Sequence, residues 1–206
     1  HSDSNAIMRL YYDPNWPRAS QWLNTHSTKS QLAILGAGCG LGSITPGRCD
    51  LGPAAIREAI ERFCSYDACS DVDLRDFPIA DYGNLAVSHL LVDDAFEPIS
   101  THSKIALKSN KALILLGGDN SITRPGMYGF GLPLTRCGLI TLDAHLDMRD
   151  IARGLSNGNP VAALLNDGLP GQNVYQIGIQ SFANSKEYLT EAREYGNKII
   201  FMDELQ

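Results

Sequence analysis

The sequence lacks several features that would assign it to a simple class. No apolar run approaches the roughly 18 residues that a membrane-spanning helix requires, and the first residues hold no apolar signal core. The 17 Lys and Arg residues are outnumbered by 23 Asp and Glu, which gives a net charge of -6, and they form no basic cluster. We therefore predict no nucleic-acid partner, no membrane partner and a small-molecule substrate.

Cysteine is also sparse. The five cysteines are scattered, odd in number and without the paired spacing of a zinc site. They predict reduced thiols of a cytoplasmic protein rather than a disulfide framework. The rest is ordinary, because 206 residues of which 44% are hydrophobic suffice for one core. Residues 1–6 resemble an expression-tag remnant, so we take residues 7–206 as a single domain.

Strand and helix patterns alternate along the chain. Helical patterns occupy residues 15–28, 53–63, 161–166 and 185–195, and a further helical region up to residue 108 is expected to break at Pro98. Apolar strand patterns occupy residues 32–36, 77–83, 111–116, 138–142, 173–179 and 198–202. Ser121 or Asn120 is expected to cap the segment after the third strand. This alternation predicts α/β units with a parallel sheet covered on both faces, a doubly wound three-layer α/β/α sandwich.

A glycine-rich loop at residues 36–42 invites a nucleotide-binding interpretation. The dinucleotide fingerprint requires its glycines to open a helix at once. Here residues 43–53 continue as a loop that contains Pro46 and Gly47. The match to a nucleotide-binding motif is therefore poor.

The most informative stretch is residues 138–149, an apolar run that ends in Asp143, His145 and Asp147. A single Asp or His at a strand end usually bonds to nearby amides. Three at alternate positions of extended backbone would project to one side, with Ala144 and Leu146 pointing away. Because crowded carboxylates repel one another, the arrangement predicts a bound cation at the carboxyl end of the strand.

Four motifs share the order found in one family. They are the loop and helix of residues 42–58, then Asp81-Tyr82-Gly83-Asn84, then Gly117-Gly118-Asp119-Asn120-Ser121, and finally Asp143-Ala144-His145-Leu146-Asp147. The chain from about residue 30 onward resembles the ureohydrolases, the family of arginase, agmatinase and formimidoylglutamase. Residues 143–149 and the loop to residues 157–160 look most like the formimidoylglutamase branch. That branch hydrolyses N-formimidoyl-L-glutamate to glutamate and formamide in histidine degradation.

The resemblance implies an arginase-like fold and a catalytic centre with two Mn²⁺ ions bridged by hydroxide. Asp143 would bridge the two ions, His145 would bind one and Asp147 the other. Carboxylates with one imidazole suit Mn²⁺ better than thiolate-binding metals. Arg149 is a candidate to bind a substrate carboxylate, because a guanidinium matches a carboxylate bidentately. Asn157 is a second candidate substrate-binding residue, and the resemblance also implies a homo-oligomer.

The chain departs from the family pattern at three points. Asn120 stands where most members carry a metal-binding His, and an amide oxygen is the weaker ligand. Asn157 stands where arginases carry a His. The family also has a later strand with a second Asp-x-Asp pair, whose spacing Asp203 and Glu204 lack, so we expect a C-terminally incomplete domain with little turnover.

Three hypotheses remain open. The first is a fragment or shortened form of a Mn-dependent formimidoylglutamase-like hydrolase, and the second is an agmatinase or another guanidino hydrolase. The third, which Asn120 favours, is an inactive relative that acts through binding or assembly.

Overall fold

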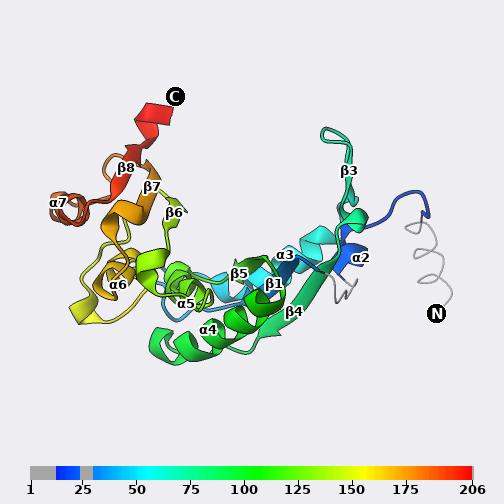
Figure 1. Ribbon diagram of the computed structural model, residues 1–206, viewed down its shortest axis with the longest axis horizontal. Helices are drawn as coiled ribbons and strands as arrows, with labels where there is room; N and C mark the ends of the chain where they lie inside the picture. Colours follow the sequence, from blue (N-terminus) through cyan, green and yellow to red (C-terminus); the bar gives the residue numbers. More distant parts are fainter. Residues whose placement is uncertain (1–12, 24–29, 206) are drawn as a thin grey trace.

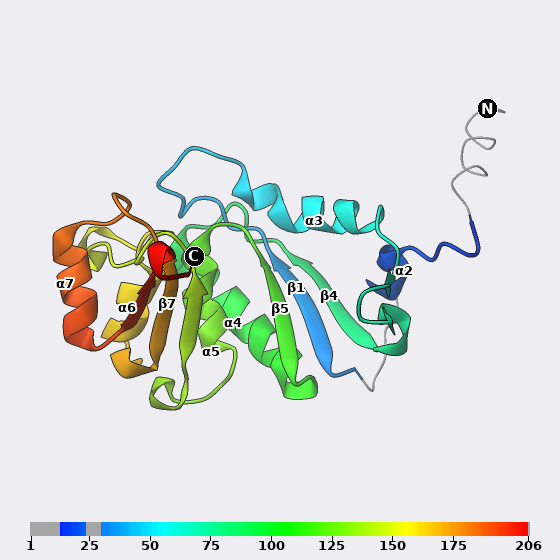
Figure 2. The same cartoon turned by 90° about the horizontal axis from the view of Figure 1, so that it is seen from above.

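The computed structural model of the protein describes residues 13–23 and 30–205. Two three-stranded parallel half-sheets lie side by side, with helices around them (Figures 1 and 2). The strands are β1 (Leu32–Ala37), β2 (Tyr66–Asp67), β3 (Val72–Asp73), β4 (Ile79–Leu85), β5 (Ala112–Gly117), β6 (Leu139–Leu142), β7 (Val174–Ile179) and β8 (Lys198–Phe201). The helices are α2 (Ala19–Leu23), α3 (Gly52–Ile60), α4 (Val92–Ser109), α5 (Thr123–Tyr128), α6 (Pro160–Asn166) and α7 (Lys186–Tyr195).

The N-terminal half-sheet has the order β4-β1-β5 and is covered on both faces (Figure 1). On one face, Ile34 of β1 packs in a cluster with Trp22 of α2 and Ile60 of α3. On the other face, Ile99 of α4 packs with Leu115 of β5. Its central strand is therefore buried, as its uninterrupted apolar sequence predicts.

The C-terminal half-sheet has the order β6-β7-β8 and is covered on one face only. Side chains of this face, such as Val174, join a cluster with Leu164 of α6 and Ala192 of α7. On the opposite face Ile140 is 68% exposed and Leu142 is 82% exposed. We predicted a buried strand here, and that prediction is wrong because no described element covers this face.

The two half-sheets are joined by helices. Within the described residues β5 and β6 are not paired, so the sheet comes in two parts. Arg124 of α5 forms an ion pair of 2.6 Å with Asp167, which follows α6. The Arg124 guanidinium also lies 4.7 Å from the ring centroid of Phe96 in α4. These contacts hold the second half against the first.

Most sequence-predicted elements are present, with local corrections. Helix α4 runs unbroken through Pro98, because the burial of Ala95 and Ile99 on one face outweighs the missing N–H. The turn after β5 is capped by Asp119, which accepts a hydrogen bond from the Ser121 amide, rather than by Ser121 or Asn120. The β2–β3 hairpin and α5 were not predicted.

Several further expectations have plain outcomes. All five cysteines are free. No helix in the described part of the chain is long and apolar enough to cross a membrane. The helix predicted over residues 15–28 is present only as α2, since residues 15–18 are not helical, and its part over residues 24–28 lies outside the described residues. The proposed tag remnant at residues 1–6 also lies outside them.

Candidate metal centre

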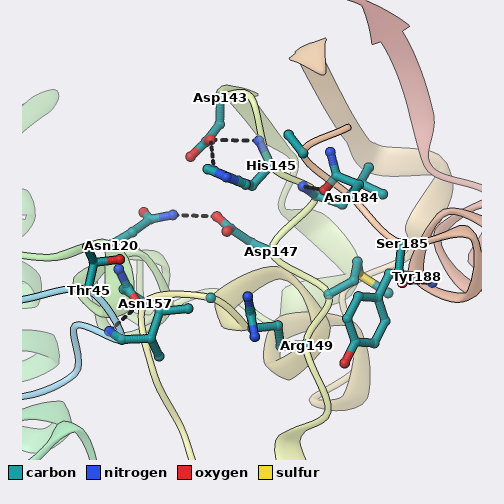
Figure 3. A pocket seen from close by; sticks show the side chains of 15 residues that line it. Thr45, Asn120, Asp143, His145, Asp147, Arg149, Asn157, Asn184, Ser185 and Tyr188 are labelled. Carbon is teal, nitrogen blue, oxygen red and sulfur yellow. Dashed lines mark hydrogen bonds and ion pairs between the residues drawn. The ribbon is translucent and has the colours of Figure 1, made fainter. Parts of the chain in front are cut away.

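The candidate site lies in the loop after β6, at the carboxyl end of the C-terminal half-sheet. Strand β6 ends at Leu142, and Asp147 has a left-handed φ of 53°, so the segment is not the extended ladder that we predicted. Asp is among the few residues that adopt this conformation readily. Asp143, His145 and Asp147 nevertheless line one cavity of about 480 Å³ (Figure 3). We call residues 143–147 the ligand loop.

Asp143 and His145 are hydrogen-bonded to each other where they line this cavity (Figure 3). The Asp143 Oδ1 accepts a hydrogen bond of 2.8 Å from the His145 backbone amide and lies 3.2 Å from His145 Nδ1. The imidazole is 62% exposed and the Asp143 carboxylate 32%. Neither side chain is therefore locked in place, and both are free to turn toward a ligand.

Asp147 is held deeper in the cavity by a residue of the other half of the molecule. Its Oδ2 accepts a hydrogen bond of 2.5 Å from Asn120 Nδ2, which follows β5. The Asn120 Oδ1 in turn accepts a hydrogen bond of 2.6 Å from Thr123 Oγ1. Asn120 thus presents its NH₂ group to the site and has its oxygen occupied elsewhere, which is not the orientation of a metal ligand.

The surroundings of the Asp147 carboxyl disfavour its ionised form. Burial, and secondarily the charge of Asp143, raise its pKa from 3.8 to about 7, while the Asn120 hydrogen bond acts in the opposite direction. Asp147 is 7% exposed and forms no ion pair among the described residues, so a bound cation would stabilise its carboxylate. The donor set of two carboxylates and an imidazole therefore fits a divalent ion such as Mn²⁺.

The side chains do not yet converge on a single point. Among residues 13–23 and 30–205, no three His, Cys, Asp or Glu side chains are gathered closely enough to hold a metal ion. The reason is visible in Figure 3, where His145 turns toward Asp143 while Asp147 turns toward Asn120. The residue types that bind a divalent ion are therefore present, but in this structure their side chains are hydrogen-bonded to other side chains of the protein.

The two predicted substrate-binding residues also line the cavity. Arg149 is exposed and forms no ion pair within the described residues, so its guanidinium is available to an anion. Asn157 precedes Gly158, whose carbonyl accepts a hydrogen bond from the Arg149 amide, and the Asn157 Oδ1 accepts a hydrogen bond of 3.1 Å from the Ile44 amide. The sequence motifs did not place Asn157 against the loop after β1, because only the folded chain brings them together.

Another wall of the cavity was not predicted. Asn184 and Ser185, from the segment between β7 and α7, and Tyr188 of α7 line it. The Tyr188 hydroxyl accepts a hydrogen bond from the Asp150 amide at 3.4 Å. The available signal was positional, since loops after neighbouring parallel strands meet at the same edge of a sheet.

The chain is thus a parallel α/β domain with an acid–imidazole–acid loop at the carboxyl end of its strands, the edge at which open α/β sheets bind ligands. Residues 30–206 match the arginase family, and the chain belongs to that family. Its three-layer, arginase-like fold is thereby confirmed, since formimidoylglutamase from Bacillus subtilis superposes with a TM-score of 0.84 over 95% of this chain and 63% of the other, at 24% identity.

Relatives of two branches are similar in sequence. Formimidoylglutamase from Halalkalibacterium halodurans is 31% identical over 178 residues, which cover 84% of this chain and 56% of the relative. Agmatinase from Bacillus cereus is 27% identical over 157 residues, which cover 75% of this chain and 53% of the relative. Formiminoglutamase from Trypanosoma cruzi, solved with Mn²⁺, superposes with a TM-score of 0.81 at 20% identity, over 92% of this chain and 66% of the other. The chain thus spans about half the length of the curated relatives it matches.

Proposed function

We propose that this protein is a Mn²⁺-dependent hydrolase of linear C–N bonds in amidines or guanidines, with N-formimidoyl-L-glutamate as substrate and glutamate and formamide as products. The observation that carries the proposal is the shared cavity, where Asp143, His145 and Asp147 lie without a Lys or Arg partner among the described residues. When bound, Mn²⁺ supplies an activated water and stabilises negative charge on the attacked carbon's substituents.

The chain's own residues have separate roles in this proposal. Asp143 and His145, which are free to turn, and Asp147, which is buried, supply the metal ligands. Asn120 holds the Asp147 carboxylate through its NH₂ group and leaves one metal position weak. Arg149 and Asn157 line the same cavity and contact the substrate there.

A second cavity supports the choice of substrate. This cavity of about 520 Å³ adjoins the first, because both are lined by Ile44, Arg149 and Tyr188, and it also contains Arg153. Its charged lining consists of these two arginines and one carboxylate, that of Asp150, and the excess of positive charge attracts an anionic tail. The glutamate part of formimidoylglutamate carries two carboxylates, whereas the tail of agmatine carries an ammonium group. The charges therefore favour formimidoylglutamate over agmatine.

The alternatives keep specific support. The similarity to agmatinases supports a guanidino hydrolase. The occupied oxygen of Asn120 supports an inactive relative that acts through binding or assembly.

The five free thiols favour a cytoplasmic location. The exposed apolar face of Ile140 and Leu142 favours a homo-oligomer.

The test measures Mn²⁺ binding and then ligand binding to the Mn²⁺-loaded 206-residue chain. We expect tighter binding of formimidoylglutamate than of agmatine or arginine, together with little release of formamide, ammonia or urea. Little turnover is expected because the described residues supply one acidic pair where the family resemblance implies two. Preferential binding of agmatine would overturn the substrate assignment, and rapid turnover would overturn our account of the ligand set. Absence of Mn²⁺ binding would overturn the metallohydrolase proposal itself.

A further inference from the structure

We infer that Asn184 is a positioning residue that holds the ligand loop in its shape, with buried Gln176 as its counterpart on the other side of the loop. This inference rests on the proposed function, because it assigns residues that arrange the proposed metal ligands. Neither residue belongs to the acid–imidazole–acid motif.

Asn184 forms two hydrogen bonds with the backbone of the ligand loop, and Figure 3 shows the one to Leu146. Its Oδ1 accepts a bond of 2.8 Å from the Leu146 amide, and its Nδ2 donates a bond of 2.9 Å to the Ala144 carbonyl. The two contacted residues flank His145. One side-chain amide thus spans the middle of the loop and fixes the backbone on both sides of the imidazole.

Gln176 holds the same loop from the sheet. This fully buried residue of β7 donates a hydrogen bond of 2.7 Å from its Nε2 to the Leu146 carbonyl. Its own Oε1 accepts a bond of 3.0 Å from Asn197 Nδ2, which is also buried. Both backbone groups of Leu146 are therefore bonded to side chains, one from Asn184 and one from Gln176.

These bonds matter because they hold the middle of the loop at Leu146, whereas the backbone hydrogen bonds from other described segments reach only Asp143, Ala144 and Asp147 of the loop. It contains no helix or strand, and Asp147 sits at a left-handed φ of 53° that must be imposed by its surroundings. The side chain of Leu146 is 1% exposed and anchors the loop in the core of the C-terminal half-sheet. Because Leu146 is fixed by its buried side chain and its two backbone hydrogen bonds, the neighbouring residues His145 and Asp147 both line the cavity.

The experiment compares Asn184→Ala with a control at the other end of the same strands. Asn173, just before β7, donates a hydrogen bond of 2.9 Å from its Nδ2 to the Cys137 carbonyl, just before β6. Asn173→Ala thus removes a side-chain-to-backbone bond of equal length far from the loop. A third variant, Asn184→Asp, keeps an oxygen that can accept from the Leu146 amide.

The first measurement is hydrogen exchange of the Leu146 amide, followed by NMR without metal. We expect at least about tenfold faster exchange in Asn184→Ala after correction for global stability, unchanged exchange in Asn173→Ala, and partial protection in Asn184→Asp. Equal acceleration in the two alanine variants would overturn the inference. This measurement does not depend on the proposed function.

The second measurement is the Mn²⁺ dissociation constant, from the EPR signal of free Mn²⁺. Loss of a residue that orients metal ligands weakens binding by about 10–100-fold, and we expect this in Asn184→Ala but not in Asn173→Ala. If Asn184→Ala binds Mn²⁺ as the unaltered protein does, the positioning role is wrong and the metal site stands. If the unaltered protein binds none, the proposed function fails, and the exchange of Leu146 still decides what Asn184 does.

Discussion

The two half-sheets are built from the same parallel pairing but are stabilised differently. The N-terminal one is covered on both faces, and its strand β1 is almost wholly buried. The C-terminal one is covered on one face by an apolar cluster that includes Leu164 and Val174, and it also contains hydrogen-bonded buried amide side chains such as Gln176 and Asn197. The ligand loop follows β6 and therefore belongs to the C-terminal half-sheet. The comparison indicates that apolar packing fixes the scaffold, while specific polar bonds fix the shape of the site.

The site itself depends on the junction of the halves. Asn120 follows β5 in the first half, whereas Asp147 follows β6 in the second, and the two side chains are hydrogen-bonded. Arg124 and Asp167 bridge the same junction through an ion pair. The relative position of the halves therefore sets the relative position of residues on the two sides of the cavity.

The largest expected effect is loss of this ion pair. In Arg124→Ala, Asp167 loses its partner, and breaking such a buried pair costs about 3 kcal/mol in the free energy of unfolding. Arg57→Ala is the matched control, because Arg57 and Asp81 form a similarly buried pair inside the N-terminal half. Chemical denaturation should show similar losses, but Mn²⁺ binding should weaken only in Arg124→Ala. Equal effects on Mn²⁺ would mean that the junction does not set the site.

The next effect concerns the buried carboxyl group of Asp147. Since its pKa is raised to about 7, mainly by burial, its stabilising protonated form is full below pH 4 and is lost as the pH rises through 7. Asp147→Asn stays neutral at every pH. Relative to the unaltered metal-free protein it should therefore gain up to about 4 kcal/mol in stability between pH 4 and pH 8.

Asp143→Asn sharpens this test. It removes the charge that contributes to the raised pKa of Asp147, so the loss of stability that begins near pH 4 should end at a lower pH than in the unaltered protein. The total loss of stability between pH 4 and pH 8, measured by denaturation at each pH, should therefore be smaller in Asp143→Asn. A stability difference for Asp147→Asn that is independent of pH would contradict the raised pKa.

A smaller effect is expected at Asn120. Asn120→His replaces an amide whose oxygen is occupied by Thr123 with an imidazole, which is the better ligand for a transition-type ion. We expect roughly tenfold tighter Mn²⁺ binding, about 1.4 kcal/mol, by EPR titration. Thr123→Val serves as the control, because it frees the amide oxygen without adding a ligand. Unchanged binding in Asn120→His would mean that residue 120 does not face the ion.

Much of this architecture follows from the sequence, because apolar runs bounded by glycine and polar residues encode parallel strands locally. The residues of the candidate site were also found, as a motif. Their geometry was not, because the φ of Asp147 and the bond from Asn184, 38 positions away from Leu146, are set by the folded chain. The exposure of β6 could not be predicted either, since Leu139-Ile140-Thr141-Leu142 has the apolar sequence of a strand covered on both faces.

That exposed face yields the smallest expected effect on stability and the last test of the comparison. Leu142 is 82% exposed, so Leu142→Lys should change the free energy of unfolding by no more than about 0.5 kcal/mol. By contrast, Leu164→Ala should lower the free energy of unfolding by about 3 kcal/mol, because Leu164 is fully buried on the covered side. If the open face mediates self-association, Leu142→Lys should still shift the sedimentation velocity profile toward smaller species. A large stability loss in this variant at concentrations where the chain is monomeric would show that residues of the same chain cover the face.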